Sequence, residues 1–228
     1  MWTLALACAF FLSIHLMISG TELKELILGK IGGWAYYTLF SILSIGGFLW
    51  MVIAFFIAMN DRGNFILWGA PLFLKIIALV VNFVAFLLIV LGLTTPSPTN
   101  LLALFNMPER AVYGIIRVSR HPVLAGLGLW ALIHFICNGN LASWLFFGSL
   151  LALCAIGANN IDRKREAMMG NVYASIKKRT SIIPFIAIIE GRTAFAPEEL
   201  GIARVFLAAS MFSVFLVLHE MLFTARAL

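Results

Sequence analysis

Long runs of hydrophobic residues alternate with short polar segments along the chain. Each run is about twenty residues long, the length that an α-helix needs to cross the hydrocarbon core of a bilayer. Transmembrane strands would instead appear as shorter segments of alternating polarity, which this pattern lacks. We therefore expect an all-α fold, a single polytopic transmembrane helical bundle of about six membrane-spanning helices. The predicted helices cover residues 2–18, 34–59, 71–93, 121–137, 141–160 and 202–223.

The polar segments between these runs predict how the helices are connected. The sequence Asn138-Gly139-Asn140 is typical of a tight turn, so the fourth and fifth helices should form an antiparallel hairpin. A short amphipathic segment, residues 101–119, leads into that hairpin. Residues 161–201 are polar and are expected to form a cap on the cytoplasmic side. No internal repeat is visible, and the chain reads as one domain.

Composition supports the membrane interpretation, since 62% of the residues are hydrophobic and only 11% are charged. In a soluble protein a net charge of +6 would suggest a nucleic-acid partner. Here thirteen of the 16 Lys and Arg residues lie in the connections after the first, third and fifth helices, if Arg204 at the start of the last helix is counted with the third of these. The positive-inside rule places these connections in the cytoplasm and both termini outside. The expected partner is the lipid bilayer, not nucleic acid.

All four histidines lie in or at the edge of predicted membrane helices: His15, His121, His134 and His219. Ionisable side chains are costly in such segments and tend to mark functional sites. Two histidines from facing helices are what a low-spin haem requires as axial ligands. Zinc is a weaker interpretation, because clustered thiolates or carboxylates are missing.

The spacing of the histidines leaves two ligand pairs open. His121 and His134 are thirteen residues apart, ~20 Å along a helix, so they lie at different depths. If the first helix ends near Ile18, His15 lies at the same depth in the membrane as His121. If that helix continues through Leu28, His15 moves toward mid-membrane and can pair with His134.

The cytoplasmic side carries a second group of candidate residues. Arg120 and Pro122 flank His121 at the start of the fourth helix, where proline is favoured. The basic segment 162–185 is interpreted either as a loop that sets topology and touches anionic lipid, or as an ordered cap. In the second interpretation Arg179, Thr180 and Tyr173 close a cavity at the inner ends of the helices.

Several motifs together resemble the NnrU family. They are Arg120-His121-Pro122, Gly126, Trp130-Ala131-Leu132-Ile133-His134, Asn138-Gly139, Ile161-Asp162-Arg163-Lys164 and Arg179-Thr180-Ser181-Ile182-Ile183-Pro184-Phe185. The resemblance covers nearly the whole chain, and His15 and His219 occupy places where that family also has histidine. It implies a multi-pass protein of the bacterial inner (cytoplasmic) membrane. It also implies an association with nitrite and nitric oxide reduction in denitrification, and hence membrane redox partners.

A related branch of this family is the 15-cis-zeta-carotene isomerase of plastids and cyanobacteria. The resemblance to it implies haem b as a cofactor and an apolar polyene as the substrate of cis–trans isomerisation. Its haem ligands correspond to His15 and His134. The depth argument above keeps His121 as the alternate. That branch has a cysteine three residues before the second histidine, where this chain has Ala131.

Two further interpretations remain open. The Arg120-His121-Pro122 motif, Tyr173 and Pro184 also fit the outline of a membrane methyltransferase that uses S-adenosylmethionine. Such an enzyme needs an acidic pair after the hairpin, for which this chain offers Asp162 and Glu166. The last interpretation is a structural subunit of a membrane complex, in which every histidine is replaceable.

Overall fold

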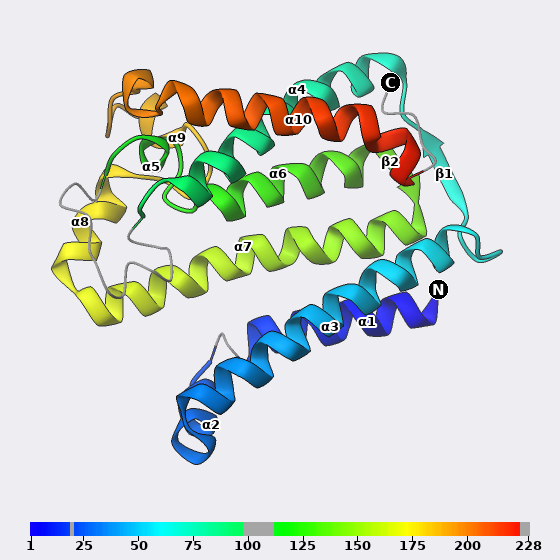
Figure 1. The fold of residues 1–228 in the computed structure, drawn as a ribbon, viewed down its shortest axis with the longest axis horizontal. Coiled ribbons are helices and arrows are strands. Elements are labelled where there is room, and N and C mark those ends of the chain that lie inside the picture. The colour runs from blue at the N-terminus through cyan, green and yellow to red at the C-terminus, as the bar shows by residue number, and fades with distance from the viewer. Residues whose placement is uncertain (19–20, 98–111, 224–228) are drawn as a thin grey trace. The chain divides into compact units, whose positions relative to one another are not determined.

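The computed structural model describes residues 1–18, 21–97 and 112–223, and most of these residues are helical (Figure 1). This confirms the predicted all-α class. The elements are α1 (Trp2–Leu12), the π-helical turn η1 (Ser13–Ile18), α2 (Leu23–Ile31), α3 (Gly33–Met59), β1 (Ile66–Gly69), α4 (Leu72–Thr94), α5 (Ile115–Val118), α6 (Pro122–Cys137), β2 (Asn138–Asn140), α7 (Leu141–Met169), α8 (Asn171–Arg179), α9 (Ile186–Ile189), the 3-10 turn η3 (Pro197–Glu199) and α10 (Ile202–Phe223). They form two compact units, Met1–Ala70 with His134–Gly157 and Pro71–Ile133 with Ala158–Leu228, which are described separately.

In the first unit, α1 packs lengthwise against α3 and runs in the opposite direction (Figure 1). Phe10 contacts Trp50 and Phe11 contacts Phe48, with ring centroids 5.8 Å and 5.9 Å apart. Gly47 permits this approach, because a β-carbon there would lie 3.0 Å from the Phe10 ring. The contact between α1 and α3 is therefore made by aromatic rings of α1 against aromatic rings and the Gly47 backbone of α3.

A short antiparallel sheet in the same unit pairs β1 with β2. The Trp68 indole donates a hydrogen bond to the Ile136 carbonyl at 3.0 Å. A β-carbon on Gly139 would lie 2.4 Å from the Trp68 carbonyl oxygen, so only glycine fits this close approach of two strands. The sequence predicted a tight turn at residues 138–140. The structure has an extended strand there instead, because the sheet with β1 supplies partners for its backbone.

The chain still reverses direction between α6 and α7, as the sequence predicted. Phe135 stacks on Trp144 with centroids 5.8 Å apart, and His134 stacks on Phe147 at 4.9 Å. The earlier residue of α6 thus contacts the later residue of α7, as expected of an antiparallel hairpin. The Ser143 backbone N–H donates to the Asn140 side-chain oxygen at 2.9 Å and so caps the first turn of α7.

In the second unit, α4 and α6 approach closely at two glycines. A β-carbon on Gly126 would lie 2.7 Å from the Ala85 carbonyl oxygen, and one on Gly92 would lie 2.9 Å from the Pro122 ring. Helix α4 also packs against α10. A buried apolar cluster joins α4, α5 and α10; its members are Leu88, Val90, Leu91, Ile115, Ile116, Val118 and Ala208. This packing holds the short α5 segment that leads into α6.

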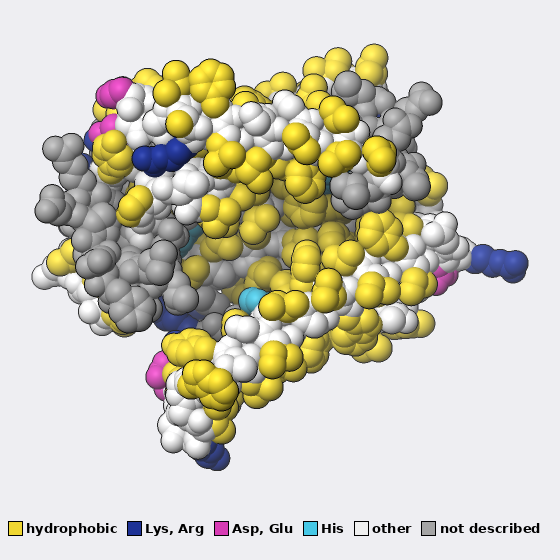
Figure 2. Space-filling model, in the orientation of Figure 1, with side chains coloured by type: hydrophobic (Ala, Val, Ile, Leu, Met, Phe, Trp, Pro, Cys, Tyr) yellow, Lys and Arg dark blue, Asp and Glu magenta, His cyan; other side chains and the backbone are white. Residues whose placement is uncertain are grey.

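Among the described residues, α3, α4, α7 and α10 are long and apolar enough to cross a membrane. The bent pair made by α1–η1 and α2 adds a fifth span if it is counted as one, whereas α6 has only 16 residues. Hydrophobic side chains cover most of the face shown in Figure 2, as expected of helices that face lipid. The chain is therefore a multi-pass membrane protein. The predicted count of about six spans is not confirmed, and the orientation of the termini stays a prediction.

Most helix boundaries agree with the sequence-based prediction, and one does not. The predicted helices 34–59, 71–93, 121–137 and 202–223 lie within one residue of α3, α4, α6 and α10. Helix α7 continues nine residues beyond the predicted end at 160, into the segment assigned to the cap. The reason is that Asp162 and Arg165, which read as loop residues, are buried in the fold. Of the predicted amphipathic segment 101–119, the part before residue 112 lies outside the described residues, and the remainder contains α5.

Candidate functional site

A buried group of polar side chains lies in the second unit, around the carboxylate of Asp162 on α7. Arg120 donates three hydrogen bonds to it, from Nε to both oxygens at 3.1 Å and 2.9 Å and from Nη2 to Oδ2 at 2.6 Å. His121 Nε2 lies 2.7 Å from Oδ1. The Tyr173 hydroxyl, on α8, donates to the same oxygen at 2.7 Å. These four residues form the Asp162 cluster.

Every member of the Asp162 cluster is almost fully buried. The exposed fraction is 8% for Arg120, 3% for His121, 4% for Asp162 and 0% for Tyr173. Burying a charge is costly unless hydrogen bonds and an opposite charge compensate for the lost water, and this carboxylate has both. Burial and the neighbouring carboxylate raise the pKa of the Tyr173 hydroxyl well above its usual value. The tyrosine therefore stays protonated and donates its hydrogen bond.

Backbone pairing between the start of α6 and the cap positions the cluster. The Arg120 N–H donates to the Ser181 carbonyl at 2.9 Å, and the Phe185 N–H donates to the Val118 carbonyl at 3.0 Å. The Ser119 hydroxyl donates to the Ile182 carbonyl at 2.7 Å. The cap is thus ordered and is fixed to the segment that carries Arg120.

The structure separates the two cap residues that the sequence had grouped together. Thr180 is 1% exposed, and its carbonyl accepts hydrogen bonds from Arg120 Nη1 at 3.2 Å and from Arg192 Nη1 at 2.6 Å. Arg179, its neighbour, is exposed. Pro122, also a predicted site residue, is buried as the first residue of α6 against Gly92. The Thr180 carbonyl is thus held by Arg120 and Arg192, while Arg179 lies at the surface.

The hydrogen bonding of the Asp162 cluster favours a structural role. Asp162 Oδ1 has three partners and Oδ2 has two, so neither oxygen has a lone pair left for a ligand. His121 contributes its Nε2 to this network, where it helps to hold the carboxylate. The cluster joins the beginning of α6, the end of α7 and α8.

The surroundings of His15 differ, because its ring is held by backbone and aromatic groups. His15 lies in η1, and its Nδ1 is 2.9 Å from the Phe11 carbonyl oxygen. A carbonyl can only accept, so Nδ1 carries the proton and the Nε2 lone pair is available. The ring packs between Phe11 and Phe40, with centroid distances of 4.3 Å and 5.4 Å. Single π-helical turns of this kind are frequent at functional sites.

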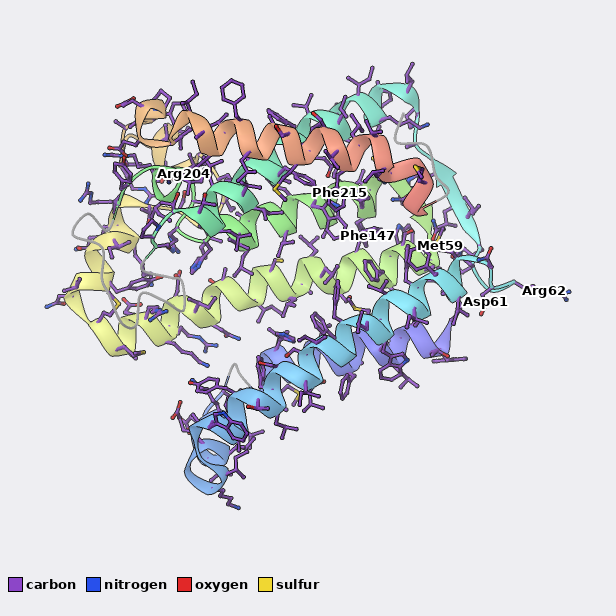
Figure 3. All side chains as sticks on the ribbon, in the orientation of Figure 1. Met59, Asp61, Arg62, Phe147, Arg204 and Phe215 are labelled. Atoms are coloured by element: carbon purple, nitrogen blue, oxygen red, sulfur yellow. The ribbon has the colours of Figure 1, made fainter. Side chains whose placement is uncertain are left out.

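His134 lies in the same unit as His15, near the end of α6. Its ring stacks on Phe147, which Figure 3 labels on α7; the rings are inclined by 29°. Phe147 in turn contacts Phe55 of α3 at 5.9 Å. The two other histidines, His121 and His219, belong to the second unit. Of the four candidates, His15 and His134 thus belong to one compact unit and His121 and His219 to the other.

Contacts between α1 and α7 relate the levels of these two histidines. The Cys8 thiol donates to the Leu145 carbonyl at 3.5 Å, so these two residues share a level. Helices α1 and α7 run in the same direction (Figure 1). His15 lies seven residues beyond Cys8, and Phe147 lies two beyond Leu145. The difference of five residues corresponds to ~7.5 Å along a helix.

The direction of the side chains reduces this difference further. Helical side chains lean toward the N-terminus of their helix, and α6 runs opposite to α7 and hence to α1. The side chains of His15 and His134 are therefore expected to lean toward each other along the helix axes. The available Nε2 of His15 and its aromatic surroundings fit haem as well. Within the described residues, no group of three or more His, Cys, Asp or Glu side chains is placed to hold a metal ion.

The sequence matches the NnrU protein family over residues 3–227, nearly its whole length. The chain belongs to the NnrU family. Two curated relatives are chloroplastic 15-cis-zeta-carotene isomerases. The one from Arabidopsis thaliana is 40% identical over 124 residues, 53% of this chain and 32% of the relative. The one from Zea mays is 38% identical over 101 residues, 42% of this chain and 28% of the relative.

This NnrU-family chain therefore spans about a third of the length of these two relatives. No solved structure matches it. The predicted resemblance to the NnrU family, and to the isomerases related to it, is confirmed. What the relatives catalyse remains a property of those proteins.

The structure also bears on the methyltransferase interpretation of this NnrU-family protein. That interpretation needs Asp162 and Glu166 to hold a cofactor. Asp162 is saturated by its own cluster, and Glu166 pairs with Lys177 at 2.8 Å. Both carboxylates are engaged within the protein, so the geometry does not favour S-adenosylmethionine as the ligand.

Sequence reasoning missed the partner that joins Arg120 and His121. Asp162 follows them by 42 and 41 positions, and no spacing rule connects residues so far apart. One signal was present, because Asp162 continues the helical register of α7 just where its apolar run stops. An acidic residue at the end of a membrane helix is expected to have a basic partner.

Proposed function

We propose that this NnrU-family protein binds haem b through His15 and His134 and catalyses the cis–trans isomerisation of an apolar polyene in the membrane. The observation that carries the haem assignment is the hydrogen bond between His15 Nδ1 and the Phe11 carbonyl. Histidines that bind metals almost always donate their other ring N–H to a carbonyl or carboxylate. This contact fixes both the tautomer and the orientation of the His15 ring.

The isomerase activity is supported by the two relatives, which carry that name. Cis–trans isomerisation is a rotation about a double bond that transfers no atom or group, so it can proceed without a general acid, base or nucleophile. Haem, when bound, would supply an iron centre whose electronic interaction with the polyene lowers the barrier to rotation about a double bond. The helices would bind the hydrocarbon and exclude water, and His15 and His134 would hold the iron at a fixed level.

A second function is favoured by one residue. Ala131 is fully buried three positions before His134, where the isomerase branch has a cysteine. If that thiol takes part in isomerisation, this chain instead serves nitrite and nitric oxide reduction, as the family name implies. In that case it would act as an accessory haem protein of the bacterial inner membrane with membrane redox partners.

Absorption spectroscopy of the purified protein tests the haem assignment. We expect a Soret band, with sharp α and β bands after reduction by dithionite and a pyridine haemochrome spectrum of haem b. His15→Ala and His134→Ala should each abolish the six-coordinate spectrum, while His219→Ala, from the other unit, should retain it. A colourless protein after haem supplementation would refute the proposal.

The reaction is tested with haem-loaded protein in liposomes that contain a cis-polyene such as 15-cis-zeta-carotene. Conversion to the trans isomer, measured by chromatography and abolished by His134→Ala, would support the isomerase. Haem-loaded protein that leaves the polyene unchanged but alters nitrite or nitric oxide reduction in membranes would assign the accessory role. The variant Ala131→Cys is a useful comparison, because it should increase isomerisation if the thiol contributes.

A further inference from the structure

Two buried hydroxyls on α3 find no hydrogen-bond partner among the described residues, those of Tyr36 and Ser44. Tyr36 is 4% exposed. A buried hydroxyl without a partner costs free energy, and the great majority of such groups in proteins are satisfied. Buried tyrosines in particular usually direct the hydroxyl to a partner. These hydroxyls therefore indicate a ligand with hydrogen-bond acceptors.

Both hydroxyls flank the residue that His15 contacts. The His15 ring packs edge-on against Phe40 at 5.4 Å, and Phe40 stacks on Tyr36 at 6.0 Å. Tyr36 and Ser44 lie four residues before and four residues after Phe40, so all three share one face of α3. The inferred subsite is thus adjacent to His15 and within the first unit.

The chemistry of the hydroxyls limits what they bind. Each can donate one hydrogen bond, and donors of this kind prefer a carboxylate, where the bond is charge-assisted. A hydrocarbon polyene has no acceptor, whereas haem b carries two propionate groups. The Nζ of Lys24, at the start of α2, lies 5.9 Å from the ring centroid of Tyr37, the exposed residue that follows Tyr36. Glu25, the neighbour of Lys24, lies 3.8 Å from that cation and partly offsets its charge.

We infer that Tyr36 and Ser44 bind the carboxylate edge of the haem, with Tyr36 donating its hydroxyl to a propionate. This inference rests on the proposed haem site at His15. It adds a positioning role for two hydroxyls on α3 and fixes which edge of the macrocycle faces that helix. The polyene would then approach from the apolar edge.

The test compares haem b with its dimethyl ester, in which both carboxylates are blocked. Titration of the apoprotein in detergent, followed through the Soret band, gives the affinity for each. Wild-type protein should bind haem b more tightly than the ester. Tyr36→Phe should weaken the binding of haem b about tenfold or more and leave the ester unaffected, because a hydrogen bond to a charged group is lost only with haem b. Ser44→Ala should show the same selectivity with a smaller loss.

The chain supplies a matched control for each variant. Tyr37→Phe and Ser41→Ala remove hydroxyls from the adjacent exposed positions and should change neither affinity. Without ligand, Tyr36→Phe should melt no lower than wild type, since its hydroxyl has no partner to lose. Equal effects of Tyr36→Phe on haem b and the ester, or no effect on either, would overturn the inference. Wild-type protein that binds neither porphyrin would refute the proposed haem site itself.

Discussion

Replacing Asp162 with asparagine should destabilise the protein more than any other single removal of a charge from the cap. Asparagine keeps the shape of the side chain but removes its charge, and it leaves Arg120 in a site where only 8% of its surface is exposed. The hydrogen bond from Arg120 Nη1 to the Thr180 carbonyl, at 3.2 Å, does not depend on Asp162. A buried cation thus loses its counter-ion, and its hydrogen bonds to residue 162 lose the assistance of charge.

The expected magnitude follows from the burial of the pair. Removing one partner of a buried ion pair costs about 3–5 kcal/mol. Tyr173→Phe removes a single hydrogen bond to the same carboxylate, which costs about 1.5–3 kcal/mol. The matched control is Glu166→Gln, because the Lys177–Glu166 pair has side chains 34% and 44% exposed. Ion pairs so accessible to solvent contribute about 0–1 kcal/mol.

Thermal unfolding of the detergent-purified variants at one fixed heating rate measures the order of these stability losses. In a chain of this length each kcal/mol shifts the midpoint by about 2–4 °C, so the loss for Asp162→Asn should be at least about 6 °C. High salt should remove any effect of Glu166→Gln and preserve that of Asp162→Asn, because buried pairs are screened little.

Two results would refute this reasoning. One is a midpoint for Asp162→Asn that matches the midpoint for Glu166→Gln. The other comes from the double variant Arg120→Met/Asp162→Leu, which removes both charges and should recover much of the lost stability. A double variant no more stable than Asp162→Asn would show that the unpaired charge is not the cause.

Two further predictions concern packing and pH. Gly126→Ala should lower the unfolding midpoint, by an amount equivalent to about 1–3 kcal/mol, because its β-carbon would meet the α4 backbone at 2.7 Å. Gly157→Ala, with nothing within 4 Å, should be neutral or stabilising, and equal midpoints for the two would contradict the described contact. Because the pKa of Tyr173 is raised in the fold, stability should be unaffected below pH ~10 and should fall as the pH rises above it. Tyr173→Phe should flatten that fall in a series of melts from pH 9 to pH 11, and an unchanged slope would exclude this tyrosine as its source.

The sequence predicted most of the helices because lipid imposes a simple rule on composition. Long apolar runs bounded by polar turns determine where a spanning helix begins and ends, which is why α3 and α10 were predicted closely. The same rule was wrong at the end of α7. Helical hydrogen bonding continues through Asp162 there because its charge is neutralised by residues distant in sequence, which no local pattern records.

The sequence predicted which residues belong to the candidate site but not which partners their side chains contact. The sequence singled out His15, His121, His134 and His219 because histidine is unusual in membrane helices. Only the structure separates His121, bound to a carboxylate, from His15, bound to a backbone carbonyl. Helical periodicity cannot reveal this difference, because the hydrogen-bond partner of a side chain depends on tertiary packing.

The Asp162 cluster also has a consequence for how the protein is made. Arg120 leaves the ribosome 42 residues before Asp162, and Tyr173 follows Asp162 by 11. Until then Arg120 has no buried counter-ion, so its charge must remain at the aqueous surface while α6 and α7 enter the bilayer. This requirement keeps both ends of the α6–α7 hairpin on one side of the membrane during insertion. The cluster can form only after Tyr173 has been synthesised, so it joins the two ends of the hairpin late in folding.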